Sequence, residues 1–172
     1  MGISLKRPGQ ENEPVPANKS IYKIFEENGR SLLILGEPAS GKTITMLQLA
    51  ESLIRKAHKD KTEPIPLVLN LSSWGAARQP LAEWLVEEIF LQYQVARGLT
   101  RSWLEHGHVL LLLDGLDEVA KDHRDGCIQA INEFKAHYAI EVVVCSRIQD
   151  YEQLKQQLNL PNAILIQPLT VA

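Results

Sequence analysis

The sequence has little cysteine, few aromatic residues and no long apolar run. Among its 172 residues only Cys127 and Cys145 are cysteines, too few for a disulfide framework, and they form no Cys-x-x-Cys pair. The longest apolar run, 109–113, is far shorter than the ~20 residues of a membrane-spanning helix. The N-terminal residues contain no apolar signal-peptide core. We therefore expect a cytoplasmic protein that has no membrane partner.

Neither sign of charge dominates the chain. Lys and Arg number 18 and Asp and Glu 21, for a net charge of −3. The tryptophans are not interleaved with basic residues, and extended basic tracts are absent, so we expect no direct nucleic-acid partner. Apolar residues make up 45% of the sequence, enough for the core of one domain of ordinary size.

One short stretch carries most of the chemical information. Gly36 to Thr43 reads Gly-Glu-Pro-Ala-Ser-Gly-Lys-Thr, which matches the phosphate-loop pattern G-x-x-x-x-G-K-[ST]. An apolar run precedes it and a helix-compatible run follows, so backbone N–H groups at a helix start can surround a phosphate. The predicted nucleotide-binding residues are Gly36, Glu37, Pro38, Ala39, Ser40, Gly41, Lys42, Thr43 and Ile44. In this interpretation Lys42 reaches the β- and γ-phosphates and Thr43 ligates Mg²⁺.

The remaining sequence alternates apolar strands with helices. Strands are expected at 31–35, 66–71, 109–114, 141–145 and 163–166, and helices at 41–58, 80–95, 100–106, 125–137 and 151–158. Gly98 is expected to break the second of these helices and Thr100 to cap the third. This alternation predicts an α/β fold, a three-layer sandwich around a five-stranded parallel sheet. Residues 1–19 are expected to be an extended lead-in and residues 20–172 a single nucleotide-binding domain.

Polar residues follow the predicted strands where each one ends. These residues are Gly36, Asn70, Asp114 and the pair Ser146-Arg147. Ligands of open α/β sheets bind beyond the carboxyl ends of the strands, so this cluster independently favours a site there.

A second motif, Leu110-Leu-Leu-Leu-Asp-Gly-Leu-Asp-Glu118, complements the phosphate loop. A strand that ends in an aspartate is the Walker B arrangement, and it predicts Asp114 as the second Mg²⁺ ligand. Asp117 and Glu118 follow in the turn, where an acidic group can activate the attacking water. The sequence leaves both open for that role, with Asp117 preferred.

Together these motifs resemble the NACHT-type NTPases of the STAND class of signalling ATPases. The resemblance rests on the two motifs above and on Val143-Val-Cys-Ser-Arg147, and it spans roughly residues 20 to 170. The family form usually has glycine where this chain has Ala39. The resemblance implies the strand order 5-1-4-3-2 and a γ-phosphate sensor role for Arg147. It also implies a switch that exchanges ADP for ATP and assembles with other protomers, in many bacterial members for defence or cell-death signalling. The family's helical, winged-helix and sensor segments, and any effector domain, are absent from this chain.

The leading hypothesis is a Mg²⁺-dependent, ATP-binding signalling switch with slow hydrolysis. Its cofactors are ATP or ADP and Mg²⁺, and its catalytic residues are Lys42, Asp117, Glu118 and Arg147. One alternative is a small-molecule kinase that uses the same loop, although two acids behind Asp114 fit hydrolysis better. Another is an interaction module that binds nucleotide only for stability. A GTPase is less favoured, because the guanine-reading Asn-Lys-x-Asp motif is absent.

Overall fold

The computed structural model of the chain describes residues 2–75 and 79–168. Residues 169–172 of the expected domain lie outside this part, as do Met1 and residues 76–78. The strands are β1 (Ile3–Lys6), β2 (Glu13–Pro14), β3 (Leu32–Gly36), β4 (Ile65–Asn70), β5 (Val109–Asp114), β6 (Val142–Arg147) and β7 (Ala163–Ile166). The helices are α1 (Ile21–Glu27), α2 (Lys42–Lys59), α3 (Leu81–Tyr93), α4 (Arg97–His106), α5 (Arg124–His137) and α6 (Ile148–Glu152). Three 3-10 turns are η1 (Leu71–Ser73), η2 (Leu116–Glu118) and η3 (Lys121–His123).

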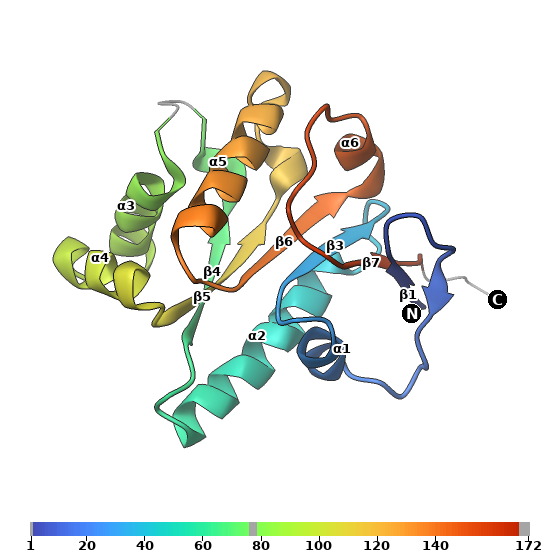
Figure 1. Cartoon of the computed structure of the whole chain (residues 1–172), viewed down its shortest axis with the longest axis horizontal. Coiled ribbons are helices and arrows are strands. Elements are labelled where there is room, and N and C mark those ends of the chain that lie inside the picture. The colour runs from blue at the N-terminus through green and yellow to red at the C-terminus, as the bar shows by residue number, and fades with distance from the viewer. Residues whose placement is uncertain (1, 76–78, 169–172) are drawn as a thin grey trace.

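A seven-stranded mixed sheet forms the centre of the molecule, in the order β2-β1-β7-β3-β6-β5-β4 (Figure 1). Strands β7, β3, β6, β5 and β4 run parallel to one another. By contrast, β1 is antiparallel to both β7 and β2. The expectation of five parallel strands is therefore wrong in strand count, and the order of the whole sheet differs from the expected one. Numbered among the parallel strands alone, the order reads 5-1-4-3-2.

The two additional strands come from the expected lead-in, residues 1–19. β1 pairs with β7 over four positions, from Ile3 opposite Ile166 to Lys6 opposite Ala163. This segment has no apolar run that would mark a buried strand. β1 has a hydrogen-bonded neighbour on each side, β7 and β2, and the short, exposed β2 forms the edge of the sheet. The lead-in is thus part of the sheet and protects the edge of β7.

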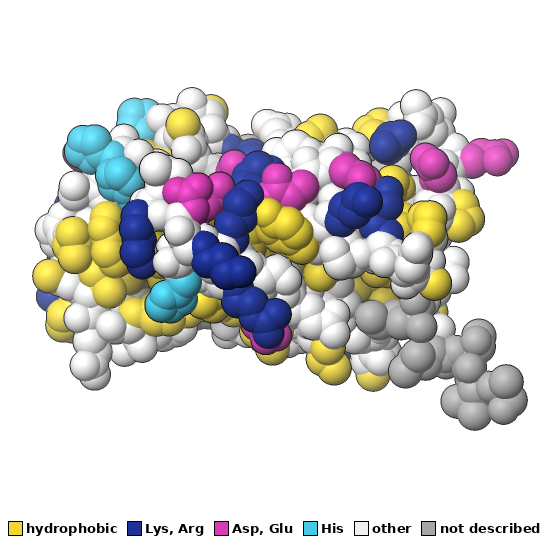
Figure 2. Space-filling model, turned by 90° about the horizontal axis from the view of Figure 1, so that it is seen from below, with side chains coloured by type: hydrophobic (Ala, Val, Ile, Leu, Met, Phe, Trp, Pro, Cys, Tyr) yellow, Lys and Arg dark blue, Asp and Glu magenta, His cyan; other side chains and the backbone are white. Residues whose placement is uncertain are grey.

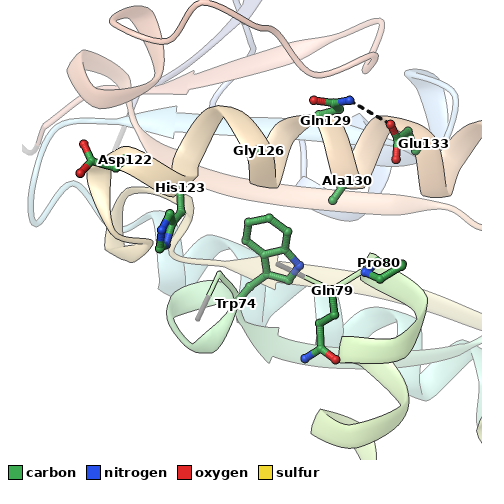
Figure 3. A pocket seen from close by; sticks show the side chains of 9 residues that line it. All are labelled: Trp74, Gln79, Pro80, Asp122, His123, Gly126, Gln129, Ala130 and Glu133. Atoms are coloured by element: carbon green, nitrogen blue, oxygen red, sulfur yellow. Dashed lines mark hydrogen bonds between the residues drawn. The ribbon is translucent and has the colours of Figure 1, made fainter. Parts of the chain in front are cut away.

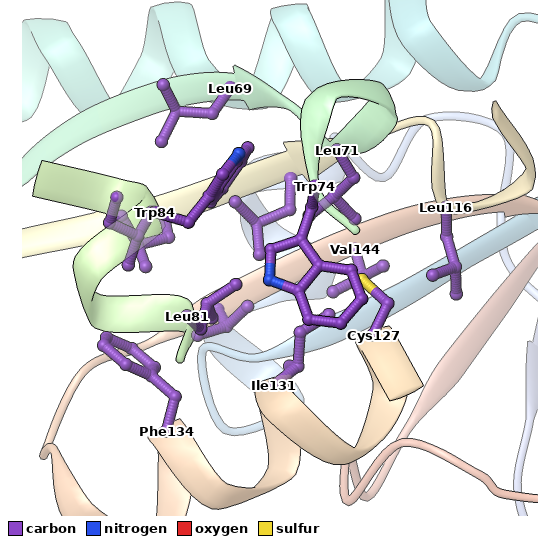
Figure 4. Close-up of a cluster of buried hydrophobic side chains, with 14 of the residues drawn as sticks. Leu69, Leu71, Trp74, Leu81, Trp84, Leu116, Cys127, Ile131, Phe134 and Val144 are labelled. Atoms are coloured by element: carbon purple, nitrogen blue, oxygen red, sulfur yellow. The ribbon is translucent and has the colours of Figure 1, made fainter. Parts of the chain in front are cut away.

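Helices cover both faces of the sheet, so the architecture is an α/β sandwich. In β3, Leu32 and Ile34 belong to one apolar cluster with Met46 and Leu49 of α2. Leu33 and Leu35 alternate with them and belong to a second cluster with side chains of α3 and α5, part of which Figure 4 shows. Every residue of Val109–Leu113 is buried, as expected for a parallel strand covered on both faces.

Two helices differ from their predictions. Gly98 does not end α3, because the chain turns at Gln94 in a left-handed conformation, and α4 already begins at Arg97. Thr100 therefore lies inside α4, fully buried, and caps nothing.

The predicted helix at 151–158 is replaced by the short α6, which ends at Glu152, and by a loop. Polar side chains of α5 bind the backbone amides of this loop. Asp125 accepts from the N–H groups of Lys155 and Gln156, and Asn132 accepts from that of Asn159. Because these amides are satisfied by tertiary contacts, the segment needs no helix of its own.

Charged side chains of both signs lie interspersed on the face shown in Figure 2. The ion pairs of the chain include that of Lys56 with Glu63, at 3.2 Å. Arg30 contacts Glu26, Glu63 and Glu141. Among the described residues, none of the helices combines the length and the apolar character that crossing a bilayer would require.

Candidate functional site

The carboxyl ends of four parallel strands meet at one edge of the sheet and bring the predicted site residues together. Gly36 at the end of β3 lies opposite Arg147 of β6, and Asn70 at the end of β4 lies opposite Asp114 of β5. The register of the sheet thus gathers positions that are far apart in the sequence.

Between β3 and α2 the chain makes a compact turn over the predicted phosphate loop. The Ser40 N–H donates to the Glu37 carbonyl oxygen at 3.1 Å, and Gly41 has φ of 95° just before the helix. No side chain caps the N-terminus of α2, and the first amides of a helix have no partner within it. These amides therefore have the arrangement that favours an anion.

Position 36 requires glycine because neighbouring atoms approach it closely, and not because of its backbone angle. A Cβ at this position would lie 2.4 Å from Ser40 Oγ and 3.2 Å from Lys42 Cγ. Ala39 adopts φ of 59° although it carries a Cβ, a conformation that costs an L-residue roughly 1–2 kcal/mol. Pro38 and Ala39 are exposed, and Ile44 is 61% exposed.

The Lys42 ammonium and the Thr43 hydroxyl of the motif have different hydrogen-bond partners. The Lys42 ammonium donates to the Glu37 carbonyl oxygen at 2.8 Å, so it folds back over its own loop. The Thr43 hydroxyl donates to Asp114 Oδ2 at 3.0 Å. The two predicted metal ligands are therefore in direct contact although 71 positions separate them in the sequence.

The Asp114 carboxyl is half-buried, and burial raises its pKa above the usual value. The negative charges of Glu118 and Asp117 add to the rise, whereas hydrogen bonds from Thr43 and from the Gly115 N–H oppose it. A carboxylate that is desolvated among other acids is an unfavourable charge, which a bound cation would relieve.

The two acids of η2 face different partners. Asp117 Oδ1 accepts from the Arg147 N–H at 3.1 Å, and Asp117 Oδ2 lies 3.3 Å from Arg147 Nε. Both oxygens of Asp117 are thus engaged, and its side chain is only 11% exposed. Glu118 is exposed and accepts at Oε2 from Asn70 Nδ2 at 3.0 Å.

Arg124 supports this turn, and no sequence pattern predicts that role. Its guanidinium donates to the carbonyl oxygens of Val119 and Asp117 and, at 3.0 Å, to Asp150 of α6. It therefore links the turn that carries both acids to the helix that follows Arg147. A lone arginine at a helix start has no sequence signature, because its partners, two backbone carbonyls and a distant aspartate, are brought into reach by the fold.

The donor set fits a phosphate and a Mg²⁺ ion. Ser40 Oγ is buried and has no hydrogen-bond partner among the described residues. Those residues contain no cluster of three or more His, Cys, Asp or Glu side chains that could hold a metal ion. Mg²⁺ typically takes one or two protein ligands together with phosphate oxygens and water, and the adjacent oxygens of Thr43 and Asp114 offer two such ligands.

A separate pocket lies away from these residues, between the Trp74 segment and α5 (Figure 3). It measures about 460 Å³ and contains none of the predicted site residues. Its lining residues are Trp74, Gln79, Pro80, Asp122, His123, Gly126, Gln129, Ala130 and Glu133.

Comparison of the chain with protein-family models and with curated proteins finds no match.

Proposed function

We propose that this chain is the nucleotide-binding core of a Mg²⁺-dependent ATP switch with slow hydrolysis. The observation that carries the proposal is the contact of Thr43 with Asp114 at 3.0 Å. The two residues come from two motifs that predict the same metal, and they meet at the edge of the sheet where such folds bind ligands. A chance glycine turn before a helix would not bring a strand-end aspartate to its threonine.

The chain's own residues divide the work of holding the nucleotide. The uncapped amides at the start of α2 bind phosphate oxygens, and Lys42 exchanges the Glu37 carbonyl for a phosphate. Thr43 and Asp114 hold the metal, and Mg²⁺ when bound neutralises phosphate charge. We propose that Arg147, whose side chain is 52% exposed, binds the γ-phosphate with its fork of donors.

Of the two acids, Glu118 is the better candidate for orienting the attacking water. Both oxygens of Asp117 are occupied by Arg147, so this residue serves to hold the end of β6. Glu118 is exposed, and its Oε1 remains able to accept a proton. This assignment reverses the preference for Asp117 that the sequence alone gave.

The resemblance to NACHT-type NTPases supports ATP over GTP and a switch over a metabolic enzyme. It also supports assembly with other protomers in a cytoplasmic signalling protein. The active site of a lone core lacks groups from neighbouring subunits, so we expect slow turnover.

Thermal unfolding with added nucleotide tests the proposal. ATP or ADP with Mg²⁺, at ~100 times the dissociation constant, stabilises a one-site protein by about 2.7 kcal/mol. We expect a rise in Tm that EDTA diminishes and that Lys42→Ala removes, with Lys61→Ala in an exposed turn as the matched control. A folded wild-type protein whose Tm does not respond to either nucleotide contradicts the proposal.

A further inference from the structure

Asn70 stands at the end of β4 and uses both ends of its side-chain amide. Its Oδ1 accepts from the Ser72 N–H at 2.7 Å and so caps η1. Its Nδ2 donates to Glu118 Oε2 at 3.0 Å. Because a backbone N–H must face the carbonyl end of the amide, the NH₂ group is directed at Glu118. The orientation of Asn70 is thus fixed by the fold.

Gly115 keeps the space for this contact open. It has φ of +78°, and a Cβ there would lie 3.0 Å from the Glu118 carboxyl group and 3.2 Å from Asn70 Nδ2. A side chain at position 115 would therefore push Asn70 and Glu118 apart. The small residue that follows the metal-binding aspartate thus has a physical role in this chain, which is to let the two side chains meet.

We propose that Asn70 is a positioning residue that holds Glu118 in the orientation needed to activate water. This inference rests on the proposed function, which gives Glu118 that task. Among the described residues Asn70 is the hydrogen-bond partner of the Glu118 side chain, and an exposed glutamate without it samples many rotamers. The bond holds Oε2 and leaves Oε1 able to accept from water, so Asn70 restricts Glu118 without neutralising it.

Two substitutions separate this role from a structural one. Asn70→Ser retains an oxygen that can cap η1 but has a side chain too short to reach Glu118. Asn70→Asp also retains the cap, and it places a carboxylate beside Glu118 where the donor was. We expect both variants to fold and to bind ADP within about twofold of the wild type. We expect their hydrolysis rates to fall roughly 10- to 100-fold, the cost of a misplaced catalytic group.

Asn132 offers a matched control within the same chain. It also uses both ends of its amide, accepting from the Asn159 N–H at 2.8 Å and donating to the Gln157 carbonyl oxygen at 2.9 Å. Its partners lie in the loop after α6 and not at the strand ends. Asn132→Ser should therefore leave the hydrolysis rate unchanged, even if it lowers the Tm.

A second readout does not depend on activity. In nucleotide-free protein labelled with ¹⁵N-asparagine, the Asn70 side-chain amide should show one proton shifted downfield, and Glu118→Ala should abolish the shift. This inference alone is overturned if Asn70→Ser hydrolyses nucleotide at the wild-type rate, or if the proton shift of the Asn70 side-chain amide is unchanged in Glu118→Ala. A wild-type protein that neither binds nor hydrolyses nucleotide overturns the proposed function and this inference with it.

Discussion

At the scale of single residues, Ala39 has a backbone conformation that is unfavourable for a residue with a Cβ. Its backbone is left-handed at φ of 59°, where glycine carries no steric cost. Ala39→Gly removes that cost of about 1–2 kcal/mol but adds conformational freedom to the unfolded chain. We expect the free energy of unfolding to rise by about 0.5–1 kcal/mol, measured by urea denaturation.

Gln94 provides the comparison for Ala39, because it is also left-handed, at φ of 56°, where α3 ends. Gln94→Gly should raise the free energy of unfolding by a similar amount while leaving nucleotide affinity unaltered. A loss of stability in Ala39→Gly would show that the loop does not have this backbone conformation in solution.

We expect the Asp114 carboxylate to lower the stability of the nucleotide-free protein while it contributes to Mg²⁺ binding. Its pKa is raised in the folded protein, so its contribution to stability is greatest when the carboxyl is protonated and is lost as pH rises through that pKa. Asp114→Asn keeps an oxygen for the Thr43 hydroxyl but carries no charge. At pH 7 the nucleotide-free variant should therefore have a higher Tm than the wild type, and ADP should stabilise it equally with Mg²⁺ or EDTA.

Measuring the Tm of Asp114→Asn and of the wild type at low pH tests whether the charge of Asp114 causes the difference. The difference in Tm between the variant and the wild type should shrink as the pH falls and the Asp114 carboxyl becomes protonated. A variant that melts below the wild type at pH 7 would mean that Asp114 stabilises the empty fold, contrary to its burial among acids.

At the scale of elements, the edge strand β4 is held by a side chain from α3. The Tyr93 hydroxyl donates to the Val68 carbonyl oxygen at 2.7 Å and accepts from the Val68 N–H at 3.2 Å. Tyr93→Phe removes both bonds and exposes strand-pairing groups to solvent. We expect a loss of about 0.5–1.5 kcal/mol in the free energy of unfolding, measured by urea denaturation.

Tyr138→Phe is the control for Tyr93→Phe, because the Tyr138 hydroxyl has no hydrogen-bond partner among the described residues. It should unfold at nearly the wild-type urea concentration. Equal effects of the two substitutions would indicate that the bonds to Val68 contribute nothing to holding β4.

Sequence patterns predicted well the elements whose conformation is determined by their own residues. The buried strands β3, β5, β6 and β7 are continuous apolar runs, and α2 follows a glycine loop, so each was placed to within about two residues. By contrast, β1 forms by pairing with β7. The loop after α6 takes its shape because Asp125 and Asn132 bind its backbone amides.

The candidate site divides in the same way. The motifs pointed to Lys42, Thr43 and Asp114, because the chemistry of phosphate and Mg²⁺ needs those groups at that spacing. The tasks of Asn70 and Arg124 could not be predicted, since their hydrogen-bond partners lie on other elements and only the register and packing bring them into reach.

At the scale of the whole molecule, two apolar clusters fill the faces of the sheet and the polar strand ends gather at one edge. This division leaves the start of α2, uncapped, facing the aspartate of β5. The proposed function requires that the amides of this turn bind a polyphosphate.

Backbone amide NMR shifts on addition of ADP with Mg²⁺ test this claim most directly. We predict that the largest changes fall on residues 39–44 and on the ends of β5 and β6, while the residues around the Trp74 pocket change little. Saturating nucleotide that leaves the amides of 39–44 unmoved, or that shifts chiefly the Trp74 pocket, would contradict the account.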